Sequence, residues 1–160
     1  MRIIEKAVFK FDELEERSQE KAHENYISSP YFEYVWIDES IDSLKAFCEA
    51  FRVKIKDYSI GTYGHSFFDT GETNSNFRRL KLKDAMERIA RHETGYCVFE
   101  SMKDFFHDEF NGDMKDTFKR TIEHGVHLTI QDMEYQESFK YFKELAFDNE
   151  WEFDQYGNLA

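Results

Sequence analysis

Hydrophobic residues recur at steps of three and four in several stretches of this chain, which is the spacing of one face of an α-helix. The clearest stretch starts beside Asp38, Glu39 and Asp42, whose negative charges suit the positive end of a helix dipole. Its apolar positions are Ile37, Ile41, Leu44, Phe47, Cys48 and Phe51. We therefore predict a helix over residues 37–51 with one buried face.

The last third of the chain carries the longest helical pattern. One apolar stripe consists of Met114, Phe118, Ile122, Val126, Ile130 and Met133. A second stripe continues in the next helix and consists of Tyr135, Phe139, Phe142 and Leu145. Shorter helices are expected from Ser18, which is typical of a helix start, over 80–91 and over 101–110.

Elsewhere the apolar period is two, which is typical of strands. Residues 53–60 and 65–69 alternate in this way, and Gly61–Gly64 between them predicts a hairpin turn. Segments near 2–11 and 151–154 are also β-prone. Together these elements predict an α+β fold, in which a small, mainly antiparallel sheet is packed by several helices. No linker-like segment occurs, so we expect a single globular domain over 1–160.

The charge of the chain narrows the choice of partner. The sequence has 33 Asp and Glu against 21 Lys and Arg, a formal net charge of -12, yet 18% of its residues are aromatic. A disordered acidic chain is poor in aromatic residues, because it cannot bury enough apolar surface to offset its chain entropy. The acids therefore lie outside a folded core. Such a surface attracts basic macromolecules and repels nucleic acid.

Two cysteines, Cys48 and Cys97, fall in apolar patterns, so we expect both to be buried free thiols. No apolar run approaches the roughly 20 residues of a membrane span, and the first residues lack a signal-peptide core. These features predict a cytoplasmic protein without a membrane partner.

Few residues suggest catalysis. His124 and His127 lie three apart on the predicted long helix and could share a metal ion. However, Gly125 follows His124, so the HExxH motif is absent. Gly61–Gly64 lacks the lysine and the glycine spacing of a phosphate-binding loop. We predict no catalytic residue, no metal and no cofactor, and keep a small metal-dependent enzyme using the two histidines as an alternative.

Basic charge is concentrated between two acidic ends of the chain. The segment 78–91 has six basic residues, which are Arg78, Arg79, Lys81, Lys83, Arg88 and Arg91. We expect this segment to pair with the acidic faces of the chain itself rather than with nucleic acid. A charge run that is simply solvated is the plainest interpretation.

An aromatic cluster precedes the helix predicted at 37–51. Its members are Tyr31, Phe32, Tyr34 and Trp36. Aromatic side chains with acidic neighbours are typical of protein–protein contact sites. The alternative is an irregular segment that caps the core.

Several short motifs together resemble a family of small phage and prophage proteins often labelled as antitoxins of toxin–antitoxin systems. They are Phe11-Asp12-Glu13-Leu14, Gln19-Glu20-Lys21-Ala22, Ser43-Leu44-Lys45-Ala46-Phe47-Cys48, Tyr58-Ser59-Ile60-Gly61, Asn76-Phe77-Arg78, Thr94-Gly95-Tyr96-Cys97 and Asp132-Met133-Glu134-Tyr135-Gln136-Glu137-Ser138. The resemblance spans nearly the whole chain and ends at Asn149-Glu150-Trp151-Glu152-Phe153. It implies no catalytic residues. Where the family pattern has glycine, this chain has Arg79.

The acidic surface and the resemblance together suggest a non-enzymatic protein from a mobile element. We expect it to bind and inhibit a basic host protein in the cytoplasm, such as a CRISPR nuclease or another nucleic-acid-binding defence effector, without binding nucleic acid itself. Carboxylates would occupy a groove meant for phosphates. The predicted binding residues are Glu13, Glu16, Glu20, Asp132, Glu134, Glu137 and Glu150. An antitoxin that neutralises a toxin is the neighbouring alternative.

Overall fold

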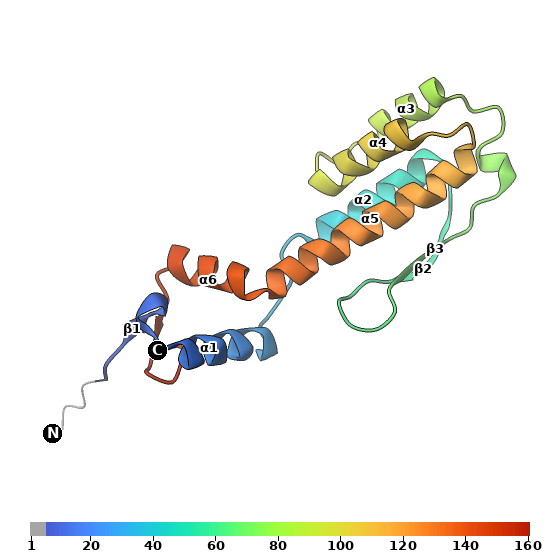
Figure 1. Ribbon diagram of the computed structural model, residues 1–160. Coiled ribbons are helices and arrows are strands. Elements are labelled where there is room, and N and C mark those ends of the chain that lie inside the picture. The colour runs from blue at the N-terminus through green and yellow to red at the C-terminus, as the bar shows by residue number, and fades with distance from the viewer. Residues whose placement is uncertain (1–5) are drawn as a thin grey trace. The chain divides into compact units, whose positions relative to one another are not determined.

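A computed structural model describes residues 6–160 of the chain, which divides into two compact units. Met1–Val35 and Glu134–Ala160 form what we call the terminal unit, and Trp36–Met133 form the central unit. Figure 1 shows the helices and strands of both. The described residues contain six α-helices and two small antiparallel sheets, so the expected α+β class is confirmed.

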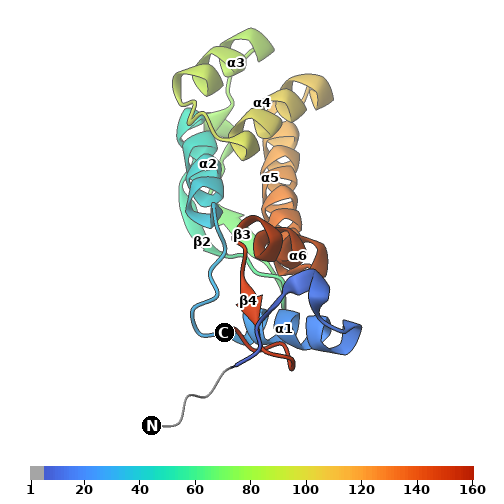
Figure 2. The same cartoon turned by 90° about the vertical axis from the view of Figure 1, so that its left-hand side faces the viewer.

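The central unit begins with α2 (Ile37–Ala50), followed by the strands β2 (Ile55–Ser59) and β3 (Phe67–Thr70). Next come α3 (Leu82–Arg91), α4 (Cys97–Glu109) and most of α5 (Met114–Glu137). Helices α2, α3 and α4 pack against one another, and Figure 2 shows α4 beside both α2 and α5.

The expected hairpin is present in the central unit. Strands β2 and β3 pair antiparallel with Tyr58 opposite Phe68, and the two rings stack 5.5 Å apart. Irregular backbone from 60 to 66 joins the strands, which is longer than the expected turn over Gly61–Gly64. A register shift between Ile55 and Asp57 interrupts the regular pairing of the two strands.

Phenylalanines fill the core of the central unit. Phe47 of α2 stacks on Phe118 of α5 with 5.8 Å between ring centroids, and Phe106 of α4 lies 5.8 Å from Phe47. All three are fully buried. Aromatic pairs at these distances add to the free energy gained from burial alone. The helical stripes predicted at 37–51 and from Met114 onward thus do face the core.

Gly125 explains how closely the helices of this unit approach. A side-chain carbon at this position would lie 2.7 Å from both Leu44 Cδ2 on α2 and Met102 Sδ on α4. Only glycine fits without moving its neighbours. Nearby, the buried hydroxyl of Thr129 donates to the Gly125 carbonyl oxygen at 2.8 Å, so this polar group is satisfied within the helix.

The terminal unit contains β1 (Phe9–Lys10), a 3₁₀ turn at Phe11–Glu13, α1 (Glu16–Ser28), the end of α5, α6 (Phe139–Asp148) and β4 (Glu152–Phe153). Strands β1 and β4 pair antiparallel, with Phe9 opposite Phe153. The expected strand over 2–11 is therefore much shorter than predicted in its described part, and residues 2–5 of it lie outside the described residues. Helix α1 begins at Glu16 rather than at Ser18.

A second aromatic core holds the terminal unit together. Phe11 meets Phe142 edge to face at 5.3 Å and Phe153 at 5.9 Å. Each unit thus has its own sheet and its own cluster of buried side chains. The four expected strands form two separate two-stranded sheets instead of one, which corrects that part of the prediction. The expectation of a single domain stays a prediction.

None of the helices in residues 6–160 combines the length and the apolar character that a membrane span requires.

Candidate functional site: an acidic hollow on helix α1

Helix α1 is fixed to the terminal unit by its inner face. Ala22 is buried, and the Ser18 hydroxyl donates to the Gln155 carbonyl oxygen at 2.7 Å. The Gln19 amide donates to the carbonyl oxygens of Phe11 and Leu14, at 3.1 and 3.2 Å. These contacts leave the opposite face of the helix free for charged residues.

That outer face carries a row of carboxylates. Glu16, Glu20 and Glu24 are four residues apart, so they lie on one side of the helix, about 6 Å from one another along its axis. All three are exposed, and they line one hollow of about 700 Å³ with His23 and Phe139. The spacing assembles a continuous negative strip.

Among the described residues, neither Glu16, Glu20 nor Glu24 takes part in an ion pair. Carboxylates at i and i+4 on a helix repel one another and reduce its stability. The sequence therefore keeps an arrangement that costs helix stability, which is a feature we expect of a surface used for binding.

His23 forms part of the wall of the hollow. Its Nε2 lies 2.7 Å from the Glu137 carbonyl oxygen, so Nε2 carries a proton and donates it. The ring also packs edge to face against Phe139, with 5.6 Å between centroids. These contacts fix the imidazole in place.

The predicted binding residues do not all lie together. Glu16 and Glu20 line the hollow, and Glu24, which was not among the predicted residues, completes the row. The i, i+4, i+8 spacing of Glu16, Glu20 and Glu24 in the sequence could have identified Glu24 as part of the row. Glu13 lies in the preceding turn, where its Oε1 accepts a hydrogen bond from the Lys10 backbone N–H at 2.7 Å.

The predicted acids near the end of the chain are dispersed. Glu134 and Glu150 are exposed and take part in no ion pair among the described residues. Glu137 is half-buried and accepts a hydrogen bond from the Tyr34 hydroxyl. Asp132 belongs to the central unit, where it lines a separate pocket.

The two units differ in charge. The terminal unit has 15 acidic and 7 basic residues, a net charge of -8, whereas the central unit has 18 and 14, a net charge of -4. Although the terminal unit is the shorter of the two, it carries two thirds of the chain's net charge of -12.

The prediction for the basic segment 78–91 is wrong within the described residues. None of its six cationic side chains joins an ion pair, and all but Arg88 are exposed. Helix α3 turns its apolar residues Ala85 and Ile89 inward, which leaves Lys83 and Arg91 in solvent. The plainer interpretation, a solvated helix face, fits this segment.

The structure adds no third metal-ligating side chain to His124 and His127 within the described residues. The His124 ring stacks on Phe105, with 4.4 Å between centroids, and burial together with neighbouring His127 lowers its pKa. No group of three or more His, Cys, Asp or Glu side chains in residues 6–160 could hold a metal ion. The arrangement therefore gives the metal-enzyme alternative no support.

The two cysteines differ, which corrects half of the sequence prediction. Cys48 is fully buried, and burial, with smaller contributions from Glu72 and Glu49, raises its pKa to about 12. Cys97 is exposed at the first position of α4. Its neighbours in sequence differ from it, because Val98 is half-buried and Phe99 is fully buried.

The aromatic cluster before α2 was interpreted either as a contact site for a partner or as a segment that caps the core, and its members differ in this respect. Phe32 packs against Tyr34 at 5.1 Å and against Tyr26 at 5.3 Å, and Tyr26 in turn packs on the core of the terminal unit. Tyr31 and Trp36 are 90% and 65% exposed. Only these two remain candidates for contact with a partner.

Comparison of the chain with protein-family models gives no match, and neither do comparisons with curated proteins and with solved structures.

Proposed function

We propose that this protein is a non-enzymatic inhibitor that binds a basic host protein through the acidic hollow on α1. The observation that carries the proposal is the row formed by Glu16, Glu20 and Glu24, three exposed carboxylates without a cationic partner among the described residues. The net charge of -8 on the terminal unit surrounds this row with further negative potential.

A surface of this kind favours, as its binding partner, a protein that normally binds nucleic acid. Grooves for phosphates are lined by Lys and Arg, and a row of carboxylates at regular spacing offers these side chains alternative anions. Opposite charges also steer the encounter and raise the association rate. Binding of this kind weakens as salt rises, because counterions screen exposed charges.

The class of target follows from the resemblance to small phage and prophage proteins. A mobile element benefits from disabling a defence effector, so we propose an RNA-guided nuclease or a similar nucleic-acid-binding protein of the host cytoplasm. Occupation of its phosphate groove would block its true ligand.

An antitoxin is a second candidate from the same resemblance. It would use the same surface and differ only in the protein that it neutralises. Co-expression with candidate toxins and, separately, with a CRISPR effector distinguishes the two, because cell growth is restored in the first case and interference is lost in the second.

The decisive experiment changes the charge of the row without changing its shape. The test variant combines Glu16→Gln, Glu20→Gln and Glu24→Gln, and the matched control combines Asp42→Asn, Glu87→Gln and Glu123→Gln, exposed acids of the central unit. Both lose three negative charges. Affinity for a purified CRISPR nuclease is measured at low and high salt, together with DNA binding by that nuclease.

We expect the test variant to lose about tenfold or more in affinity and to flatten the salt dependence, while the control stays within about twofold. Equal losses in the two variants would show that only overall charge matters. Unchanged binding by the test variant would rule out the hollow as the contact site.

A further inference from the structure

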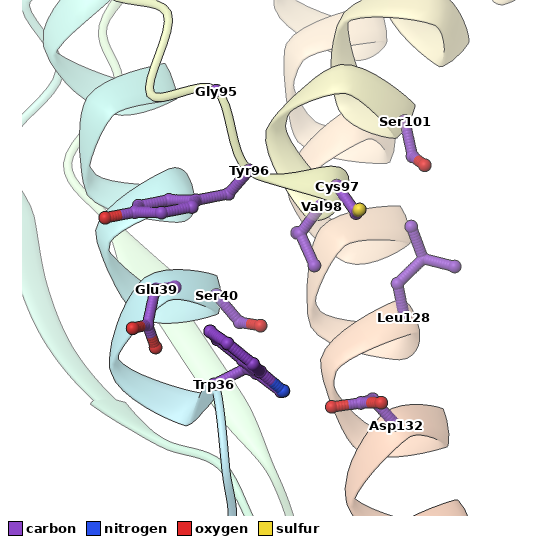
Figure 3. Close-up of a pocket in the computed structure, with 10 residues that line it drawn as sticks. All are labelled: Trp36, Glu39, Ser40, Gly95, Tyr96, Cys97, Val98, Ser101, Leu128 and Asp132. Carbon is purple, nitrogen blue, oxygen red and sulfur yellow. The ribbon is translucent and has the colours of Figure 1, made fainter.

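The central unit has a pocket of its own, with a volume of about 500 Å³. Figure 3 shows it between α2 and α5, next to the first turn of α4. The residues that matter here are Trp36, Glu39, Tyr96, Cys97, Leu128 and Asp132. This volume lies within the range of pockets that bind small ligands or single side chains.

Two aromatic side chains border this pocket and keep much of their surface in solvent. Trp36 is 65% exposed and Tyr96 is 40% exposed. In Figure 3 the Trp36 indole extends from the start of α2 toward Asp132 on α5, and Tyr96 lies over a later turn of α2. Large aromatic surfaces left in water at the edge of a pocket are typical of binding sites.

Hydrogen bonds and turn geometry fix the backbone that carries both rings. The Tyr96 N–H donates to Thr94 Oγ1 at 3.3 Å, and that oxygen lies 3.2 Å from the buried Ser43 hydroxyl of α2. Gly95 supplies the positive φ of 78° that this turn needs. Trp36 itself has a φ of 71°, a conformation that is rare for a bulky residue. The Trp36 carbonyl oxygen nevertheless accepts the Ser40 N–H at 3.1 Å, the first hydrogen bond of α2.

The charge of the pocket is negative. Glu39 on α2 and Asp132 on α5 contribute carboxylates, and no Lys, Arg or His lines it within the described part of the chain. The remaining lining is largely apolar, with Val98 and Leu128. A ligand for this pocket therefore needs an apolar or planar body and a positive charge.

We propose that this pocket binds an arginine side chain presented by a segment of a partner protein. A guanidinium is planar, stacks on aromatic faces and is more weakly hydrated than an ammonium, so it suits the indole and phenol rings better than lysine does. Its five N–H donors are also able to engage carboxylates on two sides at once.

This site is separate from the acidic hollow, because every residue that lines it belongs to the central unit. The proposal does not depend on the function proposed above. If the proposal for this pocket fails, the proposal for the glutamate row on α1 is unaffected, and the reverse also holds. The proposal for this pocket assigns Asp132, one of the predicted acids, to a site for one side chain rather than to an extended acidic face.

Cys97 gives a direct measure of occupancy. Its exposed thiol lines the pocket, whereas Cys48 is buried with a pKa raised to about 12 and stays inert while the protein is folded. The experiment measures the rate of Cys97 alkylation by iodoacetamide in the full chain. The added probes are the blocked tripeptide Gly-Arg-Gly, its lysine counterpart and its neutral citrulline counterpart.

We expect the arginine peptide to slow Cys97 alkylation at least about threefold in a saturable manner, the lysine peptide to act more weakly, and the citrulline peptide to have no effect. Equal protection by arginine and citrulline would overturn the proposal, because charge would then play no part. Absence of protection by the arginine peptide up to tens of millimolar would also overturn it.

Variants assign the effect to particular residues. Glu39→Gln with Asp132→Asn, or Tyr96→Leu, should abolish the protection, measured for each variant as the ratio of rates with and without peptide. The matched control, Asp42→Asn with Glu123→Gln, removes two exposed acids from the same helices and should retain it. Loss of protection in this control would contradict a specific pocket. A second adduct at Cys48 would reveal any variant that has unfolded.

Discussion

At the scale of single residues, two glycines of this chain are needed for different reasons. Gly157 has a φ of 89°, and a side-chain carbon there would lie 2.2 Å from the Ser18 carbonyl oxygen. Gly64 has a φ of 82° with open space around it. The first position thus combines a conformational and a steric requirement, and the second has only the conformational one.

Gly157→Ala should therefore destabilise the protein more than Gly64→Ala. The left-handed conformation costs an alanine about 1–2 kcal/mol at either site. At position 157, the clash with backbone of α1 adds about 1–3 kcal/mol, because a backbone oxygen has no other rotamer to adopt. Urea unfolding of both variants measures the difference. Equal losses would show that α1 moves aside freely.

The two thiols provide a second prediction at this scale. At pH 8, native protein should gain one alkyl group, on Cys97, and unfolded protein should gain two, because the pKa of about 12 keeps the buried Cys48 protonated. Mass spectrometry after digestion locates the adducts. Modification of Cys48 in native protein would contradict its placement in the core.

The same pKa shift predicts how stability changes with pH. The Cys48 pKa is raised in the folded state, so between about pH 9 and pH 12 the unfolded chain loses a proton that the folded chain keeps. This contribution to stability is complete below pH 9 and is lost as the pH rises. In urea unfolding at pH 8 and pH 10, Cys48→Ala should lose less stability between the two pH values than the unmodified chain does.

At the scale of elements, helix α1 shows a conflict between stability and binding. Its row of glutamates places two repulsive pairs four residues apart, Glu16 with Glu20 and Glu20 with Glu24. A helix selected for stability alone would alternate the signs of these charges. The charge repulsion that lowers the stability of α1 therefore lies at the site that we propose for binding.

Glu20→Lys should separate the two properties. The pairs with Glu16 and Glu24 become attractive, whereas the pair with Arg17, three residues earlier, becomes repulsive. The free energy of unfolding should therefore rise by about 0.5 kcal/mol, while affinity for the basic target falls. Glu20→Gln should give about half of the gain in stability. Urea unfolding and the binding assay with the nuclease, run on the same preparations, provide both readouts. A loss of stability in Glu20→Lys would mean that Glu20 makes a favourable contact.

At the scale of the whole molecule, the dominant property is excess negative charge, with few ion pairs among residues 6–160. Each unit is held by its own aromatic core, and most of the described Asp and Glu side chains are exposed to solvent. Self-repulsion of a net charge of -12 opposes the compact state, and counterions reduce it.

The melting temperature should therefore rise as NaCl is increased from about 20 mM to about 300 mM. The triple glutamine variant of Glu16, Glu20 and Glu24 should show a smaller rise, because part of the repulsion has been removed. Differential scanning calorimetry measures both. A melting temperature that falls with salt would indicate that attractive ion pairs outweigh the repulsion.

Many of the helices could be predicted from the sequence because their signals are local. The stripe from Ile37 to Phe51 and the one from Met114 to Met133 follow the helical period, and both face a core. Strands were less predictable, since pairing joins residues far apart in the chain. Phe9 pairs with Phe153, and no local pattern states which strand lies opposite which.

The candidate site was predicted only in part, for the same reason. The spacing of Glu16 and Glu20 indicates a shared helix face, and Glu24 continues it. Whether a cation neutralises an acid depends on distant segments, so the sequence could not show that the segment 78–91 makes no ion pair among the described residues. Cys97 was misplaced because its apolar neighbours suggested burial, whereas the start of α4 leaves it in solvent.

By itself the sequence determined that this chain folds, that helices dominate and that carboxylates cover its surface, because composition and periodicity act through local preferences and burial. Only the tertiary structure decided how the strands divide into two sheets, and which acids stay without ion-pair partners. It alone placed Trp36 and Tyr96 beside Glu39 and Asp132. Contacts between residues distant in sequence depend on how the elements pack, and a linear pattern does not encode that packing residue by residue.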